Sequence, residues 1–210
     1  MGMYSNSIDS FIEELSSKAA VPGGGGACGL VAAVGMSLGN MVMALTNGKK
    51  KYAKYQEEVE ETIKRASILT KDLLECMDKD AKAFEPLSKA YSLPKETREE
   101  IEYRDKVMEE ALLVAAKAPL EMMELILDAM KMIDRIAQIG SRLALSDAGV
   151  GISMCNSAME GASLNVYINT KLMKNTKEAK ALELRADELR EQASEISTKT
   201  FDYVLKEIRG

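Results

Sequence analysis

The 210-residue sequence contains no histidine and no tryptophan. Histidine is the side chain that most often transfers protons near neutral pH, and it is the commonest metal ligand. Its absence excludes Ser-His-Asp and Cys-His catalytic sites and the zinc hydrolases, and we expect no metal site. If the protein is an enzyme, its chemistry must come from carboxylates, Lys, Tyr, Cys or backbone dipoles.

Cysteine and net positive charge are also scarce. The three cysteines, Cys28, Cys76 and Cys155, lie far apart and form no Cys-x-x-Cys pair, a pattern typical of reduced thiols in a cytoplasmic protein. Without a histidine to activate them, we expect none to be a nucleophile. The 28 basic and 33 acidic side chains give a formal net charge of -5, which argues against a nucleic-acid partner.

Helical periodicity recurs throughout the chain, whereas strand-like alternation is nearly absent. The pattern predicts an all-α fold: a single multihelical bundle of about six or seven helices, in one domain over residues 1–210. Pro86 is expected to end or kink one long helix, Pro94 to start another, and Pro119 to divide it. The predicted helices cover residues 8–15, 27–45, 51–84, two stretches between 94 and 139, a small-residue segment after 146, and 177–208.

No charged residue occurs between Lys18 and Lys49, and the segment 27–45 approaches the length of a membrane span. The segment is rich in Gly and Ala, it contains Ser37 and Asn40, and the chain has no tryptophan belt. These features favour a helix buried in a helical protein or dimer over a membrane-spanning helix. We therefore expect no membrane partner.

Four consecutive glycines, Gly23, Gly24, Gly25 and Gly26, precede this helix. Such a turn exposes backbone N–H groups at a helix N-terminus, where the helix dipole favours an anion or a developing negative charge. A tight turn that lets two helices touch explains the same glycines. Both interpretations stay open at this point.

Lys49, Lys50 and Lys51 form the only dense basic cluster of an acidic chain. They follow the segment 27–45, where cations oppose the C-terminal helix dipole, but the dipole explains one lysine more readily than three. A carboxylate of a substrate is a reasonable ligand for such a cluster.

Three carboxylates occur among apolar or small residues. Asp80 falls on an apolar helical stripe, and Asp147 and Glu160 are isolated among Ala, Gly, Ser and Met. Because such carboxylates are costly unless paired or opposite a cationic ligand, all three are candidate functional residues. Helix capping by Asp147 and a structural hydrogen-bond network around Glu160 are the alternatives. Asn165 and Asn169 form a polar i,i+4 pair nearby.

A series of segments carries a family resemblance over nearly the whole chain. They are FIEEL (11–15), AVPGGG (20–25), LTNGKKKY (45–52), DKDAKAF (78–84), LPK (93–95), APL (118–120), SDAGV (146–150) and EGASLNVYIN (160–169). Together they resemble the cyclodeaminase/cyclohydrolase family of folate enzymes, which includes the C-terminal half of formiminotransferase-cyclodeaminase and stand-alone methenyltetrahydrofolate cyclohydrolases. One departure is visible, because the family commonly places Ser where Gly26 stands.

The resemblance implies an all-helical homodimer that interconverts 5-formimino-, 5,10-methenyl- and 10-formyltetrahydrofolate, with no cofactor beyond its tetrahydrofolate substrate. Our hypothesis divides the acid, base and charge-stabilising tasks among Asp80, Asp147 and Glu160, without fixing which residue has which task, because a desolvated carboxylate can hold the cationic methenyl bridge. The resemblance further implies that the substrate is bound by Gly23–Gly26, by Lys49–Lys51 at its glutamyl carboxylates, and by Asn165 and Asn169 at its pterin.

Hydrolysis of 5,10-methenyltetrahydrofolate to 10-formyltetrahydrofolate is the expected reaction. The first alternative is formiminotetrahydrofolate cyclodeaminase activity, which releases ammonia and uses the same site. The second is a non-catalytic helical dimerisation module, in which the glycines serve packing alone.

Overall fold

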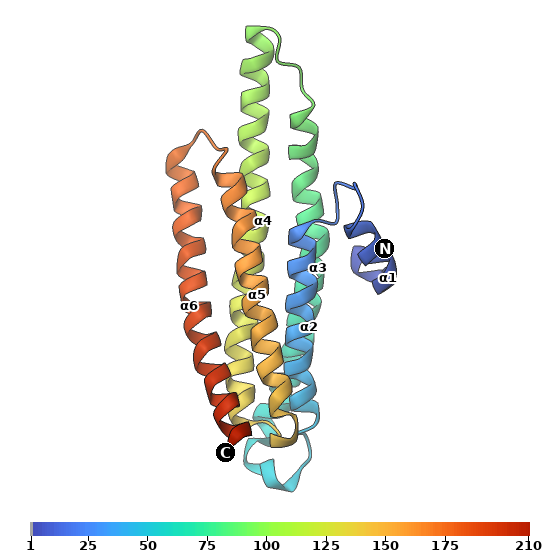
Figure 1. Ribbon diagram of the computed structural model, residues 1–210, viewed down its shortest axis with the longest axis vertical. Helices are drawn as coiled ribbons and strands as arrows, with labels where there is room; N and C mark the ends of the chain where they lie inside the picture. Colours follow the sequence, from blue (N-terminus) through green and yellow to red (C-terminus); the bar gives the residue numbers. More distant parts are fainter. Residues whose placement is uncertain (1) are drawn as a thin grey trace.

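The computed structural model describes residues 2–210, and within them the chain forms six α-helices and no β-strand (Figure 1). This confirms the predicted all-α fold. Short 3₁₀ helices, η1 (Met3–Ser5), η2 (Lys50–Tyr55) and η3 (Arg142–Ala144), lie outside the main helices. The α-helices are α1 (Ile8–Leu15), α2 (Gly24–Ala44), α3 (Gln56–Tyr91), α4 (Arg98–Ile139), α5 (Leu145–Thr170) and α6 (Thr176–Arg209).

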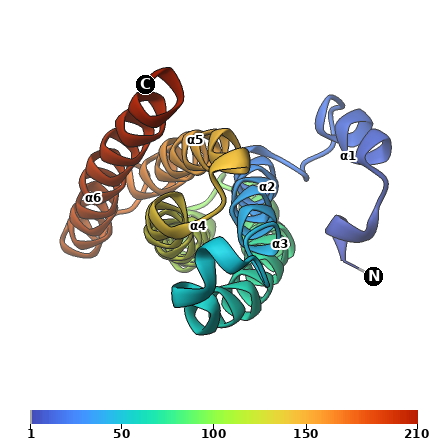
Figure 2. The same cartoon turned by 90° about the horizontal axis from the view of Figure 1, so that it is seen from below.

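Helix α4 lies at the centre of the bundle and packs against α2, α3, α5 and α6 (Figure 2). Helix α2 packs against both α3 and α5, and the α3–α4 hairpin extends beyond the end of α5 and α6 (Figure 1). The core is rich in methionine, whose unbranched side chain fills irregular gaps between helices. Its fully buried members on α4 include Met122, Met123, Ile126, Met130 and Ile133.

Pro86 was expected to end or kink helix α3, and of these two effects the end is wrong, because α3 continues past Pro86 to Tyr91. Proline removes one backbone N–H and leaves the carbonyl of Lys82, four residues earlier, without its helical partner. Both residues are exposed, so water can bond to this carbonyl. The helix also starts later than predicted, at Gln56, because Lys50–Tyr55 form η2.

Helix α4 is likewise continuous through Pro119, contrary to the predicted division at this residue. Pro119 leaves the carbonyl of Ala115 without a helical donor. The side-chain amide of Asn169 on α5 supplies the missing bond, with its Nδ2 donating to Ala115 O over 3.0 Å. A proline in one helix is thus compensated by an asparagine in its neighbour.

Helix α4 begins at Arg98, four residues after the predicted start at Pro94. Thr97 and Glu100 form a capping box that fixes this start. The Glu100 N–H donates to Thr97 Oγ1 over 3.2 Å, and the Thr97 N–H donates to Glu100 Oε2 over 2.9 Å.

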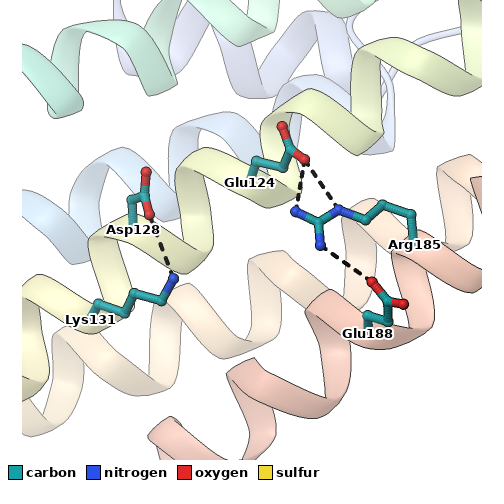
Figure 3. Close-up of polar contacts among 5 residues, drawn as sticks. All are labelled: Glu124, Asp128, Lys131, Arg185 and Glu188. Atoms are coloured by element: carbon teal, nitrogen blue, oxygen red, sulfur yellow. Dashed lines mark hydrogen bonds and ion pairs between the residues drawn. The ribbon is translucent and has the colours of Figure 1, made fainter.

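Ion pairs connect α6 to α4 on the bundle surface (Figure 3). Arg185 of α6 donates to Glu124 of α4 over 3.0 Å, and Glu188 lies 3.3 Å from the same guanidinium. Asp128 and Lys131 form a looser pair of 3.9 Å within α4. Because these side chains are about half exposed, each pair contributes at most about 1 kcal/mol to stability.

Helices α1 and α2 leave apolar surface uncovered. Helix α1 lies beside the bundle (Figure 2), with Phe11 buried but Ile8 and Ile12 exposed. Helix α2 is long and apolar enough to cross a membrane, yet half of its most apolar window is buried inside the bundle.

Candidate functional site

A cavity of about 150 Å³ lies at the N-terminus of α2, where this helix meets α3, α4 and α5. The cavity brings together several residues that the sequence separates widely. It is lined by Ala20, Val21, Gly23, Gly24, Gly25, Asp80, Phe84, Ala115, Asn165, Ile168 and Asn169.

The carboxyl group of Asp80, on α3, lies directly against the backbone of Gly25. A Cβ at position 25 would lie 2.3 Å from the Asp80 carboxyl carbon, so only glycine admits the carboxyl group this closely. Burial raises the pKa of the Asp80 carboxyl above its ordinary value of 3.8. A carboxylate with a raised pKa is a stronger proton acceptor, and its acid form is populated closer to neutral pH.

The same burial makes Asp80 costly for stability, and we expect Asp80→Asn to raise the Tm at neutral pH. A carboxyl group whose pKa is raised by folding favours the folded state below its unfolded pKa, and this contribution is lost as pH rises through the folded pKa. The wild-type protein therefore carries the penalty at neutral pH, and the Asn variant does not. A gain of about 1 kcal/mol corresponds to about 2–4 °C for a domain of this size.

Thermal unfolding measured across the pH range checks this prediction. The Tm difference between Asp80→Asn and wild type should be positive at neutral pH and should shrink as pH falls towards 3.8, the ordinary pKa. A lower Tm for the variant at neutral pH would contradict it, because Asp80 would then stabilise the fold.

Asn165 and Asn169 both use their side-chain N–H groups on backbone carbonyls. Asn165 Nδ2 donates to Gly161 O over 2.9 Å. Asn169 Nδ2 donates to Asn165 O over 2.8 Å and to Ala115 O over 3.0 Å. Their amide oxygens remain as acceptors at the cavity, so the asparagines and Asp80 favour a ligand that carries N–H donors or positive charge.

The start of α2 adds backbone donors to the same cavity. The first intrahelical bond runs from Ala27 N to Gly23 O over 3.1 Å. The N–H groups of Gly24, Gly25 and Gly26 precede this bond and have no partner within the helix. The positive end of the helix dipole therefore lies beside Asp80.

Cys28 lies one turn further along α2, close to Asp80. Burial, and secondarily the negative charge of Asp80, raise the pKa of the Cys28 thiol to about 11. This thiol is protonated at neutral pH and is a poor nucleophile. Within residues 2–210, no group of three Cys, Asp or Glu side chains is placed to bind a metal ion.

The lysine cluster lies at the opposite end of α2 from the cavity (Figure 1). The 21 residues of α2 separate the two ends by about 30 Å. Lys49 Nζ lies 3.3 Å from Ser141 Oγ in the α4–α5 turn, and Lys51 stacks on the ring of Tyr52. Lys49, Lys50 and Lys51 therefore do not reach the cavity of their own chain.

Asp147 and Glu160 also lie outside the cavity lining. Asp147 is partly buried in the first turn of α5, and 18 residues, or about 27 Å of helix, separate it from Asn165. Glu160 is exposed on the outer face of α5. Within one chain, the structure thus gathers Asp80 and the asparagines and leaves the other two candidate carboxylates apart.

The sequence of the chain matches a known protein family: residues 7–188 match the formiminotransferase-cyclodeaminase family. The chain belongs to this family. The resemblance inferred from its motifs is therefore confirmed.

Named members of the family differ in length and activity. The chain is 35% identical over 164 residues to a methenyltetrahydrofolate cyclohydrolase of Methylorubrum extorquens, covering 78% of this chain and 79% of that protein. It is 32% identical over 167 residues to the formimidoyltransferase-cyclodeaminase of Rattus norvegicus, covering 80% of this chain but only 31% of that protein. The crystal structure of a formiminotetrahydrofolate cyclodeaminase from Thermotoga maritima superposes with a TM-score of 0.87 at 23% identity, over 98% of both chains. This neighbour shows the shared fold.

The departure from the family pattern at Gly26 falls outside the cavity lining. A Cβ at this position would lie 3.4 Å from Pro22 Cβ and 3.9 Å from Met3 Sδ, which is ordinary van der Waals contact. A family member with Ser here would direct the first atom of its side chain towards Pro22. Gly23, Gly24 and Gly25 line the cavity, whereas Gly26 contributes its backbone to the start of α2.

Three further residues line the cavity that no sequence pattern marks as site residues, namely Phe84, Ala115 and Ile168. Phe84 was visible as the next position on the apolar stripe of Asp80. Ala115 carries no functional side chain, and in the sequence only the proline four residues later indicates that its carbonyl lacks a donor within the helix.

Proposed function

We propose that this family member hydrolyses 5,10-methenyltetrahydrofolate to 10-formyltetrahydrofolate. The observation that carries the proposal is the partly buried Asp80 carboxyl group, which shares a small cavity with two amide acceptors and the free N–H groups of α2. The identity to a protein named methenyltetrahydrofolate cyclohydrolase supports the choice of reaction.

The chemistry of the substrate complements the cavity. The methenyl bridge between N5 and N10 is a delocalised cation, which a desolvated carboxylate attracts more strongly than water does. A reduced pterin ring presents N–H donors, and the amide oxygens of Asn165 and Asn169 are acceptors. Asp80 would hold the bridge carbon while the asparagines orient the ring.

In the proposed reaction, water adds to the bridge carbon and passes one proton to the Asp80 carboxylate. The bond from this carbon to N5 then breaks, N5 takes up a proton, and the carbon becomes the carbonyl of the N10-formyl group. One proton is released overall, which balances the loss of the cationic charge. The N–H groups of Gly24 and Gly25 would stabilise negative charge that develops on the oxygen.

Formiminotetrahydrofolate cyclodeaminase activity is the second candidate, and the relatives named formimidoyltransferase-cyclodeaminase favour it. In this reaction N10 attacks the formimino carbon and ammonia leaves. The acid form of Asp80, which burial favours, would protonate the departing nitrogen. The two reactions need the same residues and differ in the attacking and leaving groups.

Two assays on the purified protein test these proposals. The first follows the loss of methenyltetrahydrofolate absorbance above its spontaneous hydrolysis, and the second follows ammonia release from 5-formiminotetrahydrofolate. A cyclohydrolase should give a higher kcat/KM in the first assay. Turnover of neither substrate, together with the absence of a thermal shift by tetrahydrofolates, would contradict the enzyme proposal.

We also propose that the protein is a homodimer through the outer faces of α2 and α5. Helix α2 is apolar on all sides, which is typical of a helix with neighbours all round, yet Val34 and Met41 are about 40% exposed. On α5, Val150 and Leu164 are also exposed. Val31 and Val150 line one apolar hollow of about 380 Å³, so the two faces are continuous.

A two-fold axis perpendicular to these helices would complete the site. Such an axis pairs each helix antiparallel with its copy. If Asn156 of each α5 lies on the axis, the partner's Asp147 falls opposite Asn165, because both are nine residues from Asn156. On α2, Val34 is equally far from both ends, and its neighbour Gly35 packs against Cys155 at the same level. The same axis would bring the partner's lysine cluster to the cavity end.

The dimer proposal predicts that Val34→Asp yields a monomer. Burying an unpaired carboxylate in an apolar interface should weaken association by at least about a hundredfold. Light scattering after size-exclusion chromatography at micromolar concentration measures the mass. Ile68→Asp, at an exposed apolar residue on α3, is the matched control and should remain dimeric. Equal masses for both variants and the wild type would contradict this interface.

A further inference from the structure

A second cavity, of about 260 Å³, lies where the α3–α4 hairpin meets the α5–α6 loop. It is formed by the end of α3, the first half of α4 and the α5–α6 loop. Its lining residues are Tyr91, Arg104, Asp105, Met108, Glu109, Leu112, Leu172 and Lys174.

Arg104 is the unusual residue of this cavity. Its Nε is fully buried and has no hydrogen-bond partner among residues 2–210. An arginine is charged at any physiological pH, so a buried N–H of its guanidinium that bonds to nothing is unfavourable. The Nε atom itself is closed to solvent, so an anionic ligand in the cavity would bind the outer Nη groups of the guanidinium, which form no ion pair or hydrogen bond among residues 2–210.

The acidic residues of the cavity do not fill this role, because both have other partners. The Asp105 carboxylate forms an ion pair with Lys174. The Glu109 carboxylate accepts the backbone N–H groups of Lys174 and Asn175 over 2.7 and 2.8 Å, and so fixes the α5–α6 loop. A carboxylate ligand at Arg104 would therefore add a partner without displacing one.

The Arg104 cavity and the candidate active site are both lined by α3 and α4, at different levels along these helices. On α4, 11 residues separate Arg104 from Ala115, and on α3, 11 residues separate Asp80 from Tyr91. Each interval spans about 16 Å along the helices. Exposed Ile168 lines the candidate active site, called the lower cavity below. Exposed Leu172, one turn later, lines the Arg104 cavity, called the upper cavity.

The wall between the two cavities is apolar. Phe84 belongs to the lower cavity, Met108 and Leu112 belong to the upper one, and all three pack in one cluster. Along α3 and α4, going away from the start of α2, the first cavity thus presents hydrogen-bonding groups, the wall presents apolar side chains, and the second cavity presents the Arg104 guanidinium. A tetrahydrofolate has the same order, with a hydrogen-bonding pterin, an aromatic ring and a glutamate that carries two carboxylates.

We infer that Arg104 binds a carboxylate of the substrate's glutamyl group, an inference that rests on the proposed folate function. The site differs from the sequence-predicted one at Lys49–Lys51, because it lies on the same chain as Asp80 and needs no second subunit. Arginine suits this role because its planar guanidinium can offer two parallel N–H donors to a carboxylate.

Steady-state kinetics of Arg104→Gln with two substrates test the inference. One substrate is 5,10-methenyltetrahydrofolate, and the other is the matching pteroate derivative, which lacks the glutamate. We expect Arg104→Gln to raise KM for the first substrate by about tenfold or more, the effect of losing a charge-assisted hydrogen bond. The kcat should change by less than about twofold, because the glutamate is remote from the reacting carbon. The KM for the pteroate substrate should equal that of the wild type.

Two controls exclude structural explanations. Arg98→Gln removes an exposed arginine from the same helix and should leave KM unchanged for both substrates. Arg104→Lys keeps the charge but not the two-pronged geometry, and should give an intermediate KM. Equilibrium dialysis with 5-formyltetrahydrofolate should show the same order of affinities without turnover.

The outcomes separate the two proposals. An unchanged KM in Arg104→Gln, or an equal rise with both substrates, would overturn the role of Arg104 while the wild-type activity stands. If Arg104→Gln does not fold, a wild-type KM in Arg104→Lys for the glutamate-bearing substrate would overturn it instead. A wild-type protein that neither binds nor converts either substrate would overturn the folate function itself.

Discussion

Replacing Asp80 by Asn is expected to lower kcat for methenyltetrahydrofolate hydrolysis by about a hundredfold or more. Asparagine keeps the size and the acceptor oxygen but cannot accept a proton, and it does not stabilise the cationic bridge. Because the same change is expected to raise the Tm, loss of activity cannot be attributed to loss of the fold. Asp72→Asn, the same substitution two turns earlier on α3, is the control and should leave kcat unchanged.

Asp147→Asn is expected to lower turnover by a similar factor, although Asp147 lies about 27 Å along α5 from the cavity of its own chain. In the proposed antiparallel dimer, each cavity combines Asp80 of one chain with the partner's Asp147. Unchanged rates in both Asp variants would exclude these two carboxylates from the chemistry.

Mixing the two inactive variants distinguishes a shared site from a site within one chain. If the chains exchange freely, half of the dimers carry one Asp80→Asn chain and one Asp147→Asn chain. In a shared site, one of the two cavities of such a dimer has both carboxylates intact, so about a quarter of the wild-type activity should return. If both residues acted within one chain, every cavity of the mixed dimer would lack one carboxylate and no activity would return.

The fold could be predicted because helical periodicity is local, whereas the effect of each proline depends on packing and solvent exposure, which the sequence does not give. Pro119 is a strong helix breaker by sequence. Its cost is offset by an amide of Asn169, 50 residues later, and no pattern within α4 announces this bond. Pro86 does not end its helix for a simpler reason, since Pro86 and Lys82 are both exposed and the Lys82 carbonyl that loses its helical donor can bond to water.

The parts of the candidate site that could be predicted are those whose residues break the local sequence pattern. Asp80 interrupts an apolar stripe, and four glycines in a row have few structural explanations. The same reasoning could not establish which candidates lie together, because Asp147, Glu160 and Lys49–Lys51 are separated from Asp80 by distances that only the packed helices define. Arg104 gave no sequence signal, since an arginine on a charged helix is ordinary until its Nε is found buried.

Gly25→Ala is expected to lower kcat by about tenfold or more while leaving the Tm unchanged or raised. The added methyl group would lie 2.3 Å from the Asp80 carboxyl carbon, so the carboxyl group must move. Since this group is the end of a side chain that can rotate, the fold absorbs the change. Alanine also gains up to about 1 kcal/mol of helix propensity over glycine. The added methyl group instead displaces the Asp80 carboxylate from the bridge carbon, and a shift of about 1 Å suffices for a large loss of rate.

Gly26→Ala is the matched control, because it adds the same methyl group one residue later. Its nearest neighbour would be Pro22 Cβ at 3.4 Å, and no cavity atom lies within 4 Å. Both variants should therefore show similar Tm values, and only Gly25→Ala should lose activity. A large loss in both would mean that the start of α2 needs glycine for its backbone. No loss in either would mean that the close approach of Asp80 to Gly25 does not matter for turnover. Only the split result ties the glycine run to the placement of the catalytic carboxylate.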